Sequence, residues 1–114
     1  MEKQKIESVT LTNRGNENIQ LDYAELRKAV IVLRAINHKL RQRMISLLEE
    51  HGQMAVTDIY VNMRLEQSVA SQHLAILRRA GVVDTNRQGK FIYYTLNHER
   101  IAQIGKLVEE LAGG

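Results

Sequence analysis

Hydrophobic residues recur every three or four positions over long stretches of this chain, which is the spacing of helices with one buried side. They predict helices at residues 23–36, from 37 or 38 to about 50, at 55–63 and at 65–81. Residues 82–83 and 91–96 are rich in β-branched and aromatic side chains and flank a turn at 86–90, so they predict a hairpin. A last helix is expected at 98–112, capped by Asn97. The predicted fold is mainly α with a small β-hairpin, in the order α-α-α-α-β-β-α.

The helix expected at residues 65–81 has two faces of different chemistry. Its apolar face suits a core and contains Val69, Ala70, His73, Leu74, Leu77 and Ala80. Its other face carries Gln67, Ser68, Ser71, Gln72 and Arg78. Glutamine and serine both donate and accept hydrogen bonds, as base edges in the DNA major groove require. The alternative is an ordinary solvated face, but such faces are usually rich in glutamate and lysine. A tight turn at residues 64–65 joins this helix to the preceding one, which predicts a helix-turn-helix.

The tip of the predicted hairpin is basic, with Arg87 and Lys90 in or beside the turn. Directly after a helix-turn-helix, such a tip is typical of a wing that reaches DNA phosphates or the minor groove. An ordinary hairpin with a solvated tip is the alternative. We expect polar side chains of the helix to meet base edges, Val69 to touch a thymine methyl group, and basic residues to meet phosphate. The predicted DNA-contact residues are Arg41, Gln67, Ser68, Val69, Ser71, Gln72, Arg78, Arg87 and Lys90.

The first and last helices carry apolar surface that suggests a subunit contact. Residues 23–36 are apolar on two sides, and residues 98–112 have a narrow heptad-like seam. A homodimer is predicted, although the seam could also pack back on its own domain. The expected interface residues are Leu26, Val30, Leu33, Ile101, Ile104, Val108 and Leu111. Residues 1–20 are polar and are expected to form a flexible arm, either a ragged end or a segment that packs on the partner, before a DNA-binding and dimerisation domain at 21–114.

Composition restricts the function further. The chain has 114 residues, enough for one domain, and a net charge of +3, which suits a polyanionic partner. It has no cysteine, which excludes disulfides and thiolate metal sites. No apolar run approaches the ~20 residues of a membrane span, so a cytoplasmic protein without membrane contact is expected. The sequence also lacks a phosphate-binding loop, a recognisable nucleophile or a carboxylate pair in an evident cleft, so neither an enzyme nor a cofactor is expected.

Three segments resemble the ArsR/SmtB family of winged-helix bacterial repressors. They are RQRMISLLEE at 41–50, LEQSVASQHLAILRRAGVV at 65–83 and GKFIYYTL at 89–96. The family pattern runs roughly R-x-R-I-L-x-L-L, then L-S-Q-S-T-V-S-x-H-L-x-x-L-x-x-A-G-L-V, then G-x-x-x-Y-Y-x-L. The resemblance covers about residues 22–111 and implies a homodimer joined by the first and last helices. It further implies a repressor whose two recognition helices enter successive major grooves of a double-stranded DNA operator.

The chain departs from the family pattern in three structural positions. His38-Lys39-Leu40 stands where the family has Asn/Asp-Pro-Thr, Arg64 replaces a glycine, and Glu66 replaces a serine cap. Many members also sense metals through cysteines, or through an Asp-x-His and His-x-x-Glu set on the last helix. Here Asn97 and Glu99 stand for the first pair and no histidine follows, so no metal site is expected and no inducer is indicated.

The competing function is a winged-helix protein-interaction module, which should carry aromatic or aliphatic anchors on its recognition face.

Overall fold

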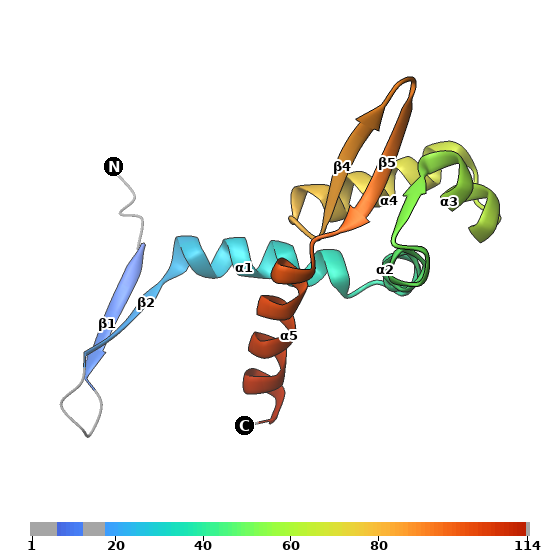
Figure 1. Cartoon of the computed structure of the whole chain (residues 1–114). Coiled ribbons are helices and arrows are strands. Elements are labelled where there is room, and N and C mark those ends of the chain that lie inside the picture. Colours follow the sequence, from blue (N-terminus) through green and yellow to red (C-terminus); the bar gives the residue numbers. More distant parts are fainter. Residues whose placement is uncertain (1–6, 13–17, 114) are drawn as a thin grey trace, which may run out of the picture.

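The computed structural model describes residues 7–12 and 18–113. Its elements, in chain order, are β1 (Ser8–Thr12), β2 (Asn18–Asp22), α1 (Tyr23–Ile36), α2 (Lys39–His51), β3 (Gln53–Ala55), α3 (Val56–Met63), α4 (Gln67–Arg79), β4 (Val83–Gln88), β5 (Phe91–Leu96) and α5 (His98–Gly113). The β4–β5 hairpin projects above the helices, and the β1–β2 hairpin lies beyond the outer end of α1 (Figure 1). The helices and the β4–β5 wing confirm the predicted fold class, whereas β1, β2 and β3 were not predicted.

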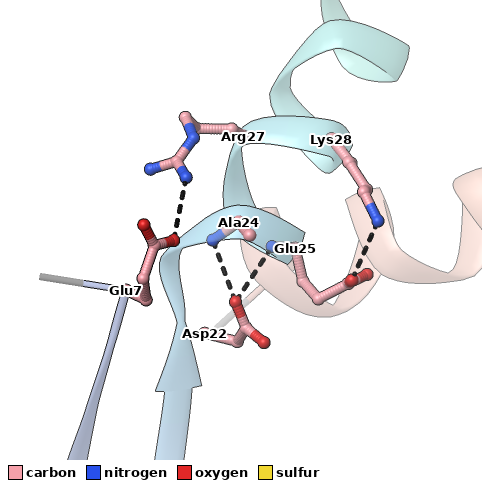
Figure 2. Close-up of polar contacts among 6 residues, drawn as sticks. All are labelled: Glu7, Asp22, Ala24, Glu25, Arg27 and Lys28. Carbon is pink, nitrogen blue, oxygen red and sulfur yellow. Dashed lines mark hydrogen bonds and ion pairs between the residues drawn. The ribbon is translucent and has the colours of Figure 1, made fainter. Parts of the chain in front are cut away.

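Side chains at the predicted boundaries cap the first two helices. The Asp22 carboxylate accepts hydrogen bonds from the N–H groups of Ala24 and Glu25, at 2.9 and 3.2 Å (Figure 2). His38 does the same for α2, because its Nδ1 accepts a hydrogen bond from the Leu40 N–H at 3.1 Å. The unusual entry to α2 therefore keeps a side-chain cap, which satisfies one of the N–H groups left free at a helix start.

Arg64 shapes the turn between α3 and α4. Its backbone is left-handed, with φ 56° and ψ 44°, a conformation that helix ends usually give to glycine. The Arg64 N–H donates to the Val61 carbonyl at 3.2 Å, and the Leu65 N–H donates to the Tyr60 carbonyl at 2.9 Å. Glu66 then occupies the N-cap position of α4 without a capping bond from its side chain. The two helices are thus joined by the short turn that the helix-turn-helix prediction requires.

β5 is the central strand of an antiparallel sheet with the order β3-β5-β4. Gly89 is the first of two turn residues between β4 and β5, and its φ of +63° suits the position where a type II′ turn favours glycine. Pairing begins at Gln88 opposite Phe91, so the turn is shorter than the predicted 86–90. In β3, Met54 lies opposite Tyr94, which attaches the connection between α2 and α3 to the base of the wing.

The core lies between α2, α3, α4 and the start of the wing. Its largest fully buried side chains are Met44, Leu48, Ile59, Leu74, Leu77, Val82 and Val83. The small side chains of Ala35, Ala70 and Ala80 also belong to this core. Within the described ranges, no helix is both long and apolar enough to cross a membrane.

A two-stranded hairpin occupies much of the region predicted to be a flexible arm. β1 and β2 pair along their whole lengths. Glu7 ties the hairpin to α1: its carbonyl accepts from the Tyr23 N–H at 2.7 Å, and its Oε2 lies 3.3 Å from Nη2 of Arg27 (Figure 2). The described part of the predicted arm is therefore paired β-structure, while residues 1–6 and 13–17 lie outside the described ranges.

Replacing Arg64 with glycine should raise the free energy of unfolding by up to about 1 kcal/mol, because glycine removes the β-carbon that disfavours a left-handed backbone. Arg64→Ala removes the same charge but keeps the β-carbon, so it is the matched control and should gain nothing. Urea unfolding at one protein concentration measures both variants. Equal stabilities of the two variants would contradict this account of the turn.

Candidate nucleic-acid interface

α4 presents its polar side to solvent, as predicted. Ala70, Leu74 and Leu77 are 0% exposed. Because these residues hold one side of α4 in the core, the opposite side of the helix faces solvent. Val69 is half-buried at the edge of the outward face. The exposed residues of that face form two rows along the helix, which are Gln67, Ser71 and Arg78 in one and Ser68, Gln72 and Arg79 in the other. Each row begins with neutral hydrogen-bonding groups and ends with an arginine.

Arg79 belongs to this surface, although the predicted contact set omitted it. It is exposed and follows Ser68 by eleven residues, which is about three helical turns. That spacing is readable in the sequence and could have placed Arg79 beside Arg78. The last turn of α4 therefore carries two positive charges on the face that begins with glutamine and serine.

Both predicted basic residues of the wing are exposed at its tip. The Nε of Arg87 donates to the Gly89 carbonyl at 3.2 Å, which holds the side chain against the turn. The Nζ of Lys90 lies 5.6 Å from the centre of the Phe91 ring, within the range of a cation–π contact. These local contacts fix where the two charges lie while leaving them open to solvent.

Arg41, which was predicted to meet phosphate, makes three hydrogen bonds within the protein. Its Nε donates to the Ala35 carbonyl at 2.6 Å and its Nη2 to the Arg34 carbonyl at 3.2 Å. Its Nη1 lies 3.1 Å from Nδ1 of His73. Because a guanidinium only donates, Nδ1 is the acceptor and the neutral imidazole carries its hydrogen on Nε2. Arg41 thus joins the end of α1, the start of α2 and the middle of α4, and two of its five N–H groups remain for other partners.

A second arginine holds the far end of α4. The Nε of Arg100, in α5, donates to the Ala80 carbonyl at 3.3 Å. Gly81 follows with φ +77°, and a β-carbon there would lie 3.4 Å from the same Nε. Asn97 caps α5 as predicted, because its Oδ1 accepts from the Arg100 N–H at 3.0 Å. Neither arginine tie was predicted from the sequence, because a long side chain that bridges two helices leaves no periodic signal.

The predicted interface residues differ in exposure. On α5, Ile104 is 9% exposed and belongs to the core, whereas Val108 and Leu111 are 45% and 70% exposed. On α1, Leu26 is 46% exposed. The remaining predicted residues are half-buried, and they are Val30, Leu33 and Ile101. The first half of the α5 seam therefore packs on its own domain, and the second half is uncovered in the protomer.

Histidines and carboxylates meet only in small groups. Among residues 7–12 and 18–113, no three histidine, aspartate or glutamate side chains lie together in a way that could hold a metal ion. The His98 Nε2 lies 2.6 Å from the Glu49 Oε2, between two exposed side chains. The rings of His38 and His73 are 4.9 Å apart beside Arg41. The first contact joins α5 to α2, and the second joins the start of α2 to α4.

Residues 38–85 match a family model described as bacterial regulatory protein, arsR family. The transcriptional repressor PagR of Bacillus anthracis is 33% identical over 92 residues, which cover 81% of this chain and 92% of PagR. The transcriptional activator HlyU of Vibrio cholerae is 32% identical over 84 residues, which cover 74% of this chain and 77% of HlyU.

The fold is also similar to solved structures. A solution structure from Mycobacterium bovis, described as a homodimeric winged helix-turn-helix DNA-binding domain, matches with a TM-score of 0.66 at 28% identity. The match covers 80% of this chain and 83% of that one.

Acid should destabilise the protein through His73. Burial lowers the pKa of His73 from its ordinary value of 6.5, and the neighbouring His38 and Arg41 lower it further. The unfolded chain therefore takes up this proton more readily, so stability is full above about pH 6.5 and is lost as the pH falls through the lowered pKa. We expect the urea midpoint of the wild type to drop between about pH 7.5 and 5.5, and to drop less in His73→Gln, whose amide oxygen can still accept from Arg41.

His51→Gln, at an exposed position of α2, is the control and should show the wild-type pH dependence. All three proteins are compared at one concentration, because dimerisation would otherwise shift the midpoint. The same pH dependence in wild type and His73→Gln would refute this role for the imidazole.

Proposed function

The chain belongs to the ArsR family of bacterial regulatory proteins, and from that membership we propose that it acts as a homodimeric transcriptional repressor. In this proposal the dimer binds a specific double-stranded DNA operator and responds to a signal other than a metal ion. The repressor role follows PagR, which is named a repressor and matches more of this chain than HlyU, which is named an activator.

The outward face of α4 is the observation that carries the proposal. Its two rows present amide and hydroxyl groups over about one and a half turns, and an α-helix with such groups fits the major groove. A protein-interaction module, the competing function, would need aromatic or aliphatic anchors at this place. The two rows contain glutamine, serine and arginine instead, so DNA is the better partner.

We assign different roles to the two ends of this surface. Gln67, Ser68, Ser71 and Gln72 read base edges, and Val69 touches a thymine methyl group from the edge of the face. Arg78 and the wing residues Arg87 and Lys90 meet phosphate or the minor groove, with Arg79 added to this group. Arg41 contacts phosphate only through the N–H groups that its internal bonds leave over.

Uncovered apolar surface supports the homodimer. Leu26 of α1 and Val108 and Leu111 of α5 are among the exposed large hydrophobic side chains. The Mycobacterium bovis relative is described as a homodimer. We propose that α1 and α5 of two protomers pack together so that the two α4 helices face successive major grooves, about 34 Å apart.

The proposed roles predict that two classes of variant lose DNA affinity in different ways. Gln72→Ala should weaken binding to an operator selected from a random duplex library by about 1–3 kcal/mol and barely change binding to a scrambled duplex. Arg87→Ala or Lys90→Ala should weaken both duplexes similarly and reduce the salt slope by about 0.9 for each phosphate that the variant no longer neutralises. Each change occurs twice in the dimer, so the effects should exceed those of a single substitution.

Titrations of both duplexes at several salt concentrations measure these effects, with Gln53→Ala on β3 as a control for removal of an exposed glutamine. Equal weakening of both duplexes by Gln72→Ala would contradict the reading role. A change in operator preference alone, caused by the wing variants, would contradict the phosphate role.

Metal ions should not act as the inducer. The chain has no thiolate, and its described histidines and carboxylates gather in no group of three. Zinc, cadmium, nickel or arsenite should therefore show no tight stoichiometric binding to the free protein in calorimetry, and should not release the operator complex. Stoichiometric binding that disappears on histidine substitution would reveal a metal site and end this part of the proposal.

A further inference from the structure

The β1–β2 hairpin has one apolar and one polar face. Residues directly opposite one another in an antiparallel pair point to the same side, and successive pairs alternate. The pairing therefore gathers the four large aliphatic residues of the hairpin on one face, namely Val9, Leu11, Ile19 and Leu21. The opposite face consists of Ser8, Thr10, Thr12, Asn18, Gln20 and Asp22.

The apolar face is largely uncovered in the protomer. Leu11, Ile19 and Leu21 are 52%, 46% and 42% exposed. In the described part of the chain, the main contacts of the hairpin beyond its own pairing are with the start of α1. Figure 1 places the hairpin beyond the outer end of that helix, away from the other elements. A two-stranded hairpin is only marginally stable in water unless its apolar face packs on something else.

The direction of the hairpin is nevertheless set by α1. The Glu7 carbonyl accepts a hydrogen bond from the N–H of Tyr23, the first residue of α1. Figure 2 shows the Glu7 carboxylate beside Arg27, and the carboxylate of Asp22, the last residue of β2, capping the same helix. The apolar face is thus held out on an arm whose position follows that of α1.

We propose that this apolar face packs on the second protomer of the homodimer, so that the hairpin is a dimerisation arm. The inference rests on the proposed homodimer and extends its interface beyond α1 and α5. Among the described residues, eight of the eleven exposed large hydrophobic side chains lie on this hairpin, α1 or α5. Because β2 ends at Asp22 and α1 begins at Tyr23, the exposed aliphatic side chains of the hairpin and of α1 lie on consecutive elements, so a second protomer packed along α1 would be within reach of the hairpin.

Two other occupants fit the arm less well. DNA offers phosphates and base edges, to which an aliphatic face contributes neither a charge nor a hydrogen bond. The body of the same protomer lies at the other end of α1, from which the ties of Glu7 and Asp22 direct the arm away.

Removing the apolar contact should weaken the dimer. Leu11→Thr combined with Ile19→Thr keeps residues that favour strands but shortens the apolar face. Because both arms of the dimer lose two buried side chains, we expect the dissociation constant, measured by sedimentation over a dilution series, to rise at least about tenfold. Thr10→Ala combined with Gln20→Ala changes the neighbouring pair on the polar face and should leave the dissociation constant within about twofold of wild type.

The outcomes separate the arm from the dimer itself. If the apolar-face variant dimerises as tightly as wild type, the proposed role of the hairpin in dimerisation is overturned, while the proposed α1–α5 interface is unaffected. If the wild-type protein stays monomeric throughout the series, both proposals are overturned. Val108→Ser with Leu111→Ser, on α5, should weaken dimerisation whether or not the arm contributes.

Crosslinking tests the occupant directly. The chain has no cysteine, so one introduced cysteine can carry a photo-crosslinker at a single place. A label at Ile19→Cys on the apolar face should give covalent dimer, and a label at Gln20→Cys on the polar face should give little. Mixing isotope-labelled and unlabelled protomers shows by peptide mapping whether the crosslink joins two chains. Crosslinks confined to one chain, or formed to operator DNA instead of protein, overturn the proposal.

Discussion

Burial of one side of α4 is the constraint on which the rest of the structure depends. Ala70, Leu74 and Leu77 have no exposed surface, and truncating a buried leucine side chain typically costs about 2–5 kcal/mol. A helix with its apolar side fixed in this way has no freedom to rotate about its axis. The two rows that begin at Gln67 and Ser68 therefore keep one orientation relative to the wing, and hydrophobic packing determines which polar groups are offered to a partner.

Arginines extend that constraint from α4 to the helices of the proposed dimer. Arg41 donates to carbonyls in the last turn of α1 and to His73, and Arg100 of α5 donates to the carbonyl of Ala80 after α4. Both reach the carbonyl groups that a helix leaves free at its C-terminal end, where a positive charge is also favoured by the helix dipole. If α1 and α5 form the subunit contact, as proposed, these ties would make the position of each α4 follow the geometry of the dimer. That coupling is what a fixed distance between two major grooves requires.

The fold and the polar face of α4 were predictable because both depend on periodicity within single elements. The same spacing that marks Leu74 and Leu77 as inward marks Ser71 and Gln72 as outward. Periodicity does not say which surface covers an apolar side chain: Ile104 and Leu111 share one seam, yet the first is in the core and the second is 70% exposed. β3 is too short to alternate. β1 and β2 do alternate between polar and apolar residues, so their strand pattern was present in the sequence, although the polar composition of residues 1–20 favoured a flexible arm. Sequence likewise placed Arg41 near the candidate site but gave no sign of its bonds to other helices.

The negative and positive charges of α4 lie at opposite ends of the helix, and this distribution affects how the proposed complex would form. Glu66 stands at its N-terminal end, and Arg78 and Arg79 stand in its last turn. A carboxylate suits the positive end of the helix dipole but repels phosphate, so the front of α4 gains little from general attraction to DNA. In the proposed complex its neutral glutamines and serines would contribute through hydrogen bonds to particular bases, while the arginines and the wing would supply attraction to any duplex. With a net charge of only +3, that general attraction would be modest, so in the proposed complex discrimination between sequences would depend on the polar groups that face outward because the other side of α4 is buried.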